Sequence, residues 1–147
     1  LDYMKNQLRP GEFVAAITVP LPGPGEVLRV EKLSKRFDCD ISGLAAGLWL
    51  RLDGDAVADA RFAFGGMAGI VRRAAGAEAA VRGRPWSEAT VQAALAALDG
   101  DFTPLSDLRA GAGYRRRAAR GLLQRLWLAT RPGAPLAEAE LSVWSTA

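Results

Sequence analysis

The chain has 147 residues, of which half are hydrophobic, and a formal net charge of +3. This composition is typical of one soluble domain with its own core. Cys39 is the only cysteine and there is no histidine, which excludes an intrachain disulfide and serine–histidine or cysteine–histidine catalysis. This composition predicts no zinc or copper site, and no apolar run reaches the ~20 residues that span a bilayer. The first residues contain neither an initiator methionine nor a signal-peptide pattern, so we expect a fragment of a longer cytoplasmic protein.

The first part of the chain predicts strands. EFVAAITVP (Glu12–Pro20) places alternate apolar residues on one face. A proline–glycine turn follows, and EVLRVEKLS (Glu26–Ser34) alternates again. We therefore expect two strands before the middle of the chain.

The stretch LWLRLDGDAVADARFAF predicts a β-hairpin. Asp53-Gly54 separates two alternating runs, and this dipeptide supplies the positive φ angles that a tight hairpin turn needs. The residues expected on the core face are Leu48, Leu50 and Leu52 before the turn, and Ala58, Ala60, Phe62 and Phe64 after it.

The second part of the chain predicts three helices. They are expected at Ile70–Val81, from the N-cap Ser87 to Gly100, and from Ser106 or Leu108 to Ala129 before Pro132. The third has an apolar stripe of Tyr114, Ala118, Leu122 and Leu126, with Leu123 and Trp127 beside it. The order predicts an α+β fold: an antiparallel sheet of three to four strands followed by three helices packed on one face. We expect the domain at residues 1–131 and a loose tail at residues 132–147.

Two motifs each allow two interpretations. FGGMAG (Phe64–Gly69) could bring backbone amides to a phosphate, but its glycine spacing matches no phosphate-binding fingerprint and favours a tight strand-to-helix turn. YRRRAARGLLQR (Tyr114–Arg125) could be a nucleic-acid surface, but the low net charge favours a solvated face or a subunit interface. We expect no nucleic-acid partner.

KLSKRFDCDIS (Lys32–Ser42) concentrates charge between two predicted strands. It could face an anionic ligand, or the charges could solvate a loop. Asp38 and Asp40 have the spacing of a catalytic pair, but ion pairs with Lys35 and Arg36 are the more natural outcome. We expect Cys39 to be a small buried residue, and we assign no catalytic residue and no metal ligand.

Four stretches together resemble a known family: KLSKRFDCDIS, ARFAFGGMAG, RRAAGAEAAVRGRPWSEAT and DFTPLSDLRAGAGYRRRAARGLLQRLWL. They are similar to the C-terminal part of the flavin subunit of molybdenum-containing hydroxylases, the CO dehydrogenase flavoprotein C-terminal domain-like family, and within it to the bacterial xanthine dehydrogenase type. The resemblance covers Glu12 to Arg131. It implies a small antiparallel sheet followed by three helices.

The resemblance also implies site residues. Lys32 matches a position that contacts FAD, and Val14 matches an apolar contact near the isoalloxazine ring. Arg36 and Asp40 match charged positions that order this edge of the site. Most FAD contacts are expected from an upstream domain.

The implied activity is oxidation of hypoxanthine and xanthine to urate, with electron transfer to NAD. The implied partners are a large subunit with the molybdenum cofactor and upstream FAD-binding and 2Fe–2S domains of the same subunit. Two alternatives remain: a flavin-subunit domain of a carbon monoxide dehydrogenase or aldehyde oxidase type enzyme, and a non-catalytic assembly domain that docks through its arginine-rich helix.

Overall fold

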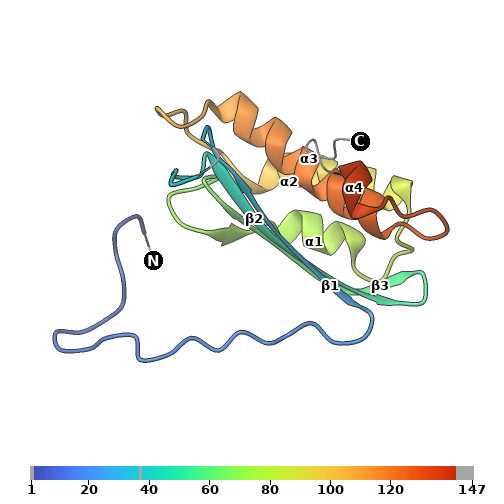
Figure 1. The fold of residues 1–147 in the computed structure, drawn as a ribbon, viewed down its shortest axis with the longest axis horizontal. Helices are drawn as coiled ribbons and strands as arrows, with labels where there is room; N and C mark the ends of the chain where they lie inside the picture. The colour runs from blue at the N-terminus through green and yellow to red at the C-terminus, as the bar shows by residue number, and fades with distance from the viewer. Residues whose placement is uncertain (1, 37, 142–147) are drawn as a thin grey trace.

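The computed structural model describes residues 2–36 and 38–141, which form a four-stranded sheet with helices on one face (Figure 1). The strands are β1 (Glu26–Leu33), β2 (Leu44–Asp53), β3 (Ala56–Gly65) and β4 (Arg72–Arg73), antiparallel and in the order β1-β2-β3-β4. The helices are α1 (Ala75–Val81), α2 (Glu88–Asp101), α3 (Ala112–Thr130) and α4 (Glu138–Leu141). The predicted α+β class and its layer order are confirmed.

The predicted hairpin is confirmed, with its turn one residue further along. Asp53 pairs with Ala56, so Gly54 and Asp55 form the two-residue loop. Gly54 has a φ of +58°, which glycine adopts without strain. The positive φ that the Asp-Gly dipeptide predicts therefore falls on Gly54 alone.

A β-bulge follows this turn and changes which side chain enters the core. The β2–β3 register shifts between Arg51 and Leu52. Val57 is fully buried, whereas Ala58, which the alternation places on the core face, is exposed. One extra residue in β3 reverses the alternation on the turn side of the bulge.

The helices bury one face of the sheet. Leu48 and Leu50 of β2 and Phe62 and Phe64 of β3 are fully buried among the helices, because every second side chain of a strand points to the same face. Burial of each such side chain contributes about 1.5–3 kcal/mol. In Figure 1 the opposite face of the sheet carries no helix.

The region predicted as one helix over Ile70–Val81 divides into β4 and a shorter α1. Arg72–Arg73 extend the sheet, and Ala74 then donates its N–H to the Phe62 carbonyl at 2.7 Å. Pairing with the sheet thus overrides local helix propensity until α1 begins at Ala75.

α2 begins as predicted after the N-cap Ser87, whose hydroxyl accepts a backbone N–H at 3.3 Å. It does not end at Gly100, as predicted, but continues to Asp101. The Asp101 carboxylate accepts the N–H groups of Gly76 and Ala77 at 2.8 and 2.9 Å. The last residue of α2 therefore caps the first turn of α1.

α3 begins at Ala112, later than the predicted start at Ser106 or Leu108. The Ser106 hydroxyl accepts the N–H of Ala112 at 2.9 Å, and Asp107 accepts two backbone N–H groups at 2.8 and 3.1 Å. These side chains fix a turn before the helix, which delays its start.

The strand predicted at Glu12–Pro20 is wrong. The segment is extended but forms no ladder with any strand of the described chain. Phe13 and Ile17 are exposed, and Figure 1 shows this part of the chain on the side of the sheet away from the helices. Alternating apolar residues indicate β character, but a strand also needs a neighbouring edge.

Beyond Leu141, the predicted tail at 132–147 lies outside the described residues. Up to that point it includes α4, where Glu138 forms ion pairs with Arg29 of β1 and, at 3.5 Å, with Arg125 of α3. These contacts tie α4 to the first strand and the third helix.

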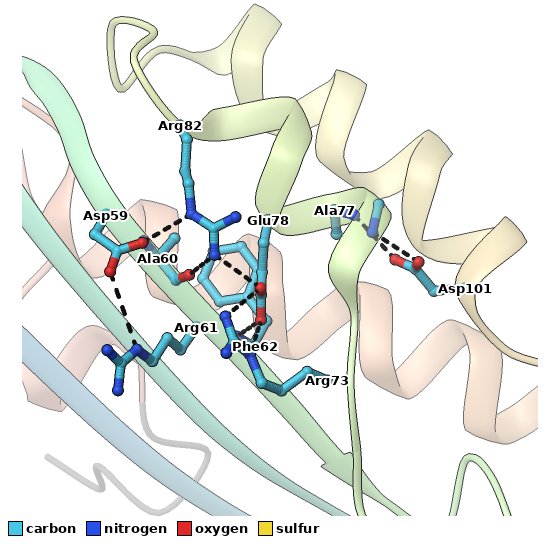
Figure 2. Close-up of polar contacts among 10 residues, drawn as sticks. Asp59, Ala60, Arg61, Phe62, Arg73, Ala77, Glu78, Arg82 and Asp101 are labelled. Atoms are coloured by element: carbon cyan, nitrogen blue, oxygen red, sulfur yellow. Dashed lines mark hydrogen bonds and ion pairs between the residues drawn. The ribbon is translucent and has the colours of Figure 1, made fainter.

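Glu78 is a buried carboxylate, 2% exposed, that connects α1 to the sheet (Figure 2). It accepts the N–H of Phe62 at 2.8 Å, two bonds from Arg73 at 2.8 and 2.5 Å, and one from Arg82 at 2.9 Å. Burial alone would raise the pKa of Glu78. This effect is outweighed by the hydrogen bonds from Arg73 and Phe62 and by the charges of Arg73 and Arg82, which hold the pKa below its usual range. The carboxylate is therefore ionised at neutral pH.

Residues after α1 also provide hydrogen-bond partners for the backbone of β3 where the short β4 does not reach. Arg82 Nη2 donates to the Ala60 carbonyl at 2.9 Å. Val57 donates its N–H to the Arg84 carbonyl at 2.9 Å and accepts the Gly83 N–H at 2.8 Å. These groups take the place of a longer neighbouring strand and protect the edge from pairing with another chain.

The substitution Glu78→Gln is expected to lower the free energy of unfolding by on the order of 3 kcal/mol, because it removes the charge that compensates two guanidinium groups. The pKa of Glu78 is lowered in the folded chain. Its stabilisation is therefore complete above the unfolded value of about 4.3 and is lost as the pH falls through the folded value. Urea unfolding between about pH 7 and pH 2 measures both effects.

The matched control is Glu88→Gln, at an exposed position of α2, which should change stability by less than about 0.5 kcal/mol. Equal losses in the two variants, or a Glu78→Gln loss that persists undiminished at the lowest pH, would contradict the role given to Glu78.

Candidate functional site

The candidate site begins on the open face of the sheet, the face opposite the helices. Leu28, Val30 and Lys32 of β1 project from it, and Val30 is 76% exposed. Arg29 and Glu31 point the other way, where Glu31 meets Arg125 of α3 at 3.5 Å. The open face of β1 is thus apolar with a lysine at its end.

Small residues lie beside that lysine. Cross-strand pairing forms two rows, Lys32–Ala45–Gly65 and Val30–Gly47–Ala63. We call Ala45, Gly47, Ala63 and Gly65 the small-residue platform. A Cβ added at Gly47 would meet no atom within 4 Å, so the platform is open above its centre. A flat group can therefore approach the backbone here.

Lys32 is exposed at the edge of the platform. It is the last residue of β1 on the open face, and within the described chain its ammonium forms no hydrogen bond or ion pair. The structure therefore leaves a cation beside a flat apolar surface. This combination suits a planar ligand that carries negative charge.

The loop between β1 and β2 is held by Asp40. Its carboxylate accepts the N–H groups of Lys35 and Arg36 at 3.0 and 2.9 Å and that of Ile41 at 2.9 Å, and it pairs with the Arg36 guanidinium at 3.4 Å. The Arg36 N–H, together with that guanidinium, holds the pKa of Asp40 below its usual range. Arg36 and Asp40 lie together, and their contacts order this loop.

The expectation of a buried Cys39 is wrong. Cys39 is exposed and has a φ of +49°, an uncommon angle for a residue with a side chain. Asp38 accepts its N–H at 2.7 Å. Cys39 lies at the tip of a tight loop, where no core is within reach of a small side chain.

A cleft of about 450 Å³ lies next to the end of β1. It separates the β1–β2 loop from the segment before α3. Its lining residues are Leu33, Ser34, Lys35, Gly43, Asp107, Leu108, Arg109, Ala110, Gly111 and Tyr114. The cleft therefore combines two cations with an aromatic ring and the start of a long helix.

Lys35 joins the two walls of this cleft. Its ammonium donates to the Leu108 carbonyl at 2.8 Å, whereas the expected ion pair with Asp40 is made by Arg36. On the far wall, Asp107 accepts the N–H groups of Arg109 and Ala110 at 2.8 and 3.1 Å and the Arg115 guanidinium at 2.7 Å. These bonds, the Arg109 N–H first, lower the pKa of Asp107 to about 2.

FGGMAG forms a tight turn into β4. Gly66 has a φ of +85°, and a Cβ at this position would lie 2.7 Å from the Gly43 carbonyl oxygen. The Gly66 carbonyl accepts Arg115 Nη1 at 2.6 Å. The expected tight turn is therefore present, but it leads into the strand β4 and not, as predicted, into a helix. Backbone packing requires glycine at position 66.

The arginine-rich helix α3 is less exposed than its sequence indicates. Arg115 is 6% exposed, while Tyr114, predicted for the apolar stripe, is 48% exposed. Arg120 binds the Leu95 carbonyl and Asp99, both at 2.7 Å. The buried stripe is Arg115, Ala119, Leu122, Leu123, Leu126 and Trp127, which fits helical spacing as well as the predicted stripe does. The helical spacing of this buried stripe is the sequence signal that could have identified Arg115.

Val14 lies in the extended N-terminal segment and is 64% exposed. Figure 1 shows that segment on the open-face side of the sheet. The flavin contact expected of Val14 stays a prediction.

Within residues 2–36 and 38–141, no three His, Cys, Asp or Glu side chains gather as a possible metal-ion site. None of the described helices combines the length and apolarity of a membrane span. The candidate site therefore consists of Lys32, the platform and the adjacent cleft.

Comparison with known sequences gives two kinds of match. A family model described as the CO dehydrogenase flavoprotein C-terminal domain matches residues 29–130. A xanthine dehydrogenase of Emericella nidulans is 33% identical over 129 residues, 85% of this chain and 10% of the relative. A nicotinate hydroxylase of the same organism is 33% identical over 132 residues, with the same coverage.

A solved carbon monoxide dehydrogenase from Hydrogenophaga pseudoflava superposes with a TM-score of 0.66 and 31% identity, covering 73% of this chain and 37% of that chain. The chain thus spans about a tenth of its curated relatives and little over a third of the solved one. The sheet and its helical layer are those of a flavoprotein domain. The chain belongs to the CO dehydrogenase flavoprotein C-terminal domain family of molybdenum hydroxylases, which confirms the resemblance drawn from its motifs.

The substitution Gly66→Ala is expected to lower the free energy of unfolding by about 2–4 kcal/mol, because it combines a left-handed φ with a backbone clash. Gly121→Ala is the matched control, since Gly121 is an exposed residue inside α3 with open space around its Cβ position. That control should stabilise the chain by up to about 1 kcal/mol. Urea unfolding of both variants measures the contrast, and a Gly66→Ala protein as stable as the parent would refute the packing described here.

Proposed function

We propose that this chain forms one wall of the FAD site in the flavin subunit of a molybdenum-containing hydroxylase. The observation that carries the proposal is Lys32, exposed beside the small-residue platform on the uncovered face of the sheet. A planar ring system can lie close to glycine and alanine backbone. An ammonium beside it favours negative charge on a reduced flavin.

The residues have separate roles in this proposal. Lys32 supplies the charge, and Val14 supplies an apolar contact near the isoalloxazine ring. Arg36 and Asp40 keep the loop after Lys32 in place, which is supported by the hydrogen bonds that Asp40 accepts from this loop. Residues 1–131 form the domain and residues 132–147 its tail, and the remaining FAD contacts come from an upstream FAD-binding domain.

We propose the xanthine dehydrogenase type of enzyme, supported by the 33% identity to a protein of that name. In this proposal hypoxanthine and xanthine are oxidised to urate in a large subunit that holds the molybdenum cofactor, and NAD accepts the electrons. FAD, when bound, exchanges electrons between one-electron centres such as 2Fe–2S clusters and a two-electron acceptor. The complex is expected in the cytoplasm.

The solved carbon monoxide dehydrogenase supports a second candidate, the flavin-subunit domain of an enzyme of that type or of the aldehyde oxidase type. The substrate is chosen in the molybdenum subunit, so the same flavin wall serves either enzyme. The assembly-domain alternative loses three of its arginines, because Arg115, Arg120 and Arg125 are engaged within this chain. Arg116 and Arg117 are the exposed arginines that it retains on this helix.

Lys32→Ala in the complete flavin subunit is expected to weaken FAD binding about tenfold and to slow flavin reduction, because it removes a charge next to the ring. Fluorescence titration of the apo-subunit measures the FAD Kd, and size-exclusion chromatography checks that assembly is intact. Lys32→Arg should retain most of the affinity.

The control is Lys5→Ala, an exposed lysine whose ion pair is with Asp2 in the N-terminal segment. Unchanged flavin content and turnover in the Lys32→Ala enzyme would remove the basis for the flavin-wall proposal. Failed assembly with normal FAD affinity would instead support the assembly-domain alternative.

A further inference from the structure

Arg115 is the one buried cation in the described part of the chain. We propose that Arg115 is a positioning residue: it locks the loop after Lys32 against the segment Asp107–Ala110 and so fixes Lys32 beside the small-residue platform. This inference rests on the proposed function, in which Lys32 lies next to a flavin.

The two terminal nitrogens of Arg115 bind two different loops. Nη1 donates to the Gly66 carbonyl at 2.6 Å, and Nη2 donates to Asp107 Oδ1 at 2.7 Å. Gly66 belongs to the turn between β3 and β4, and Asp107 to the turn before α3. One side chain therefore sets the distance between these two turns.

Both turns pack against Gly43, the residue before β2. A Cβ at Gly66 would lie 2.7 Å from the Gly43 carbonyl oxygen, and a Cβ at Gly43 would lie 3.3 Å from Ala110 Cβ. Gly43 donates its N–H to the Leu33 carbonyl at 2.8 Å, which closes the β1–β2 loop one residue after Lys32. The loops that Arg115 binds are thus packed against the base of the loop that follows Lys32.

A second connection runs through the side chain of Lys35. Asp107 holds its turn by accepting two backbone N–H groups, and within that turn the Leu108 carbonyl accepts the Lys35 ammonium at 2.8 Å. This is the contact that spans the cleft. Arg115 is therefore linked to the β1–β2 loop indirectly, through each of the two turns that it binds.

The stability of the fold alone does not explain why an arginine occupies this position. Burial of a guanidinium group costs free energy that a well-packed apolar residue would avoid. Arg115 Nε is moreover buried without a partner among the described residues. The two bonds that Arg115 makes join surface loops and add no apolar contact to the core.

A pre-ordered loop favours binding, since the ligand then need not order it. Without Arg115, the turn at Asp107 and the contact from Lys35 loosen, and Lys32 is held less closely beside the ring. FAD affinity and the flavin midpoint potential should change together, because both depend on the distance of that ammonium from the flavin.

The test uses the complete flavin subunit with Arg115→Lys, which keeps the charge but offers a single nitrogen in place of the two-nitrogen fork. Fluorescence titration gives the FAD Kd, and a spectroscopic redox titration gives the midpoint potential. We expect the Kd to rise about tenfold and the potential to become more negative, while Arg117→Gln, an exposed neighbour on α3, changes neither.

Asp107 provides a second pair of variants. Asp107→Ala should reproduce the Arg115→Lys effect, whereas Asp107→Asn should recover most of the affinity. All three bonds from Arg109, Ala110 and Arg115 Nη2 end on Oδ1, an oxygen that asparagine retains.

A double-mutant cycle with Lys32→Ala separates positioning from a purely structural role. If Arg115 acts through Lys32, Arg115→Lys should weaken FAD binding much less in the Lys32→Ala background than in the parent. Additive effects, or a lower melting temperature with unchanged FAD Kd and potential, would overturn this inference. An ineffective Lys32→Ala would instead overturn the proposed function.

Discussion

The architecture of this domain depends on a single buried carboxylate. Glu78 receives a backbone N–H from β3, a guanidinium from β4 and another from the end of α1, so it fixes the angle and distance between the helix and the sheet (Figure 2). The charge is tolerable in the interior because both arginines remain partly exposed and compensate it. The position of α1 in turn fixes that of α2, because Asp101 caps the α1 N-terminus. The helical layer is thus built outward from one ionised side chain.

In this construction the buried core that stabilises the domain lies on one face of the sheet, and the other face stays open for binding. The helices cover the large apolar residues of β2 and β3, while the same strands present the small-residue platform on the opposite side. Lys32 stands at the end of that open face, next to loops held by Asp40, Asp107 and Arg115. A polar framework thus surrounds the proposed site, whereas the apolar core lies behind it. That division leaves the open face able to bind a ligand without disturbing the fold.

Local signals in the sequence predicted much of this arrangement. The Asp53-Gly54 turn and alternating leucines identify the central hairpin, and Ser87 identifies the start of α2, because these features act between residues close in the chain. Signals that depend on distant partners were missed or misread. Ala58 is turned outward by a bulge, and Arg72–Arg73 pair with β3 although the neighbouring alanines favour helix. Arg115 is buried only because Gly66 and Asp107 lie where its nitrogens reach them. Only the family resemblance indicates Lys32, since nothing local distinguishes it from a solvated lysine.

We propose that a flavin lies against the open face of the sheet. The most direct measurement is to reconstitute the complete flavin subunit with a FAD analogue that carries a photoreactive azide on its ring system, illuminate it, and map the adducts by peptide mass spectrometry. A flavin in this position should give adducts on open-face residues of β1 and β2, at Lys32 and Val30 above all. Adducts confined to the helical layer, or labelling of the upstream domain with none in this chain, would contradict it.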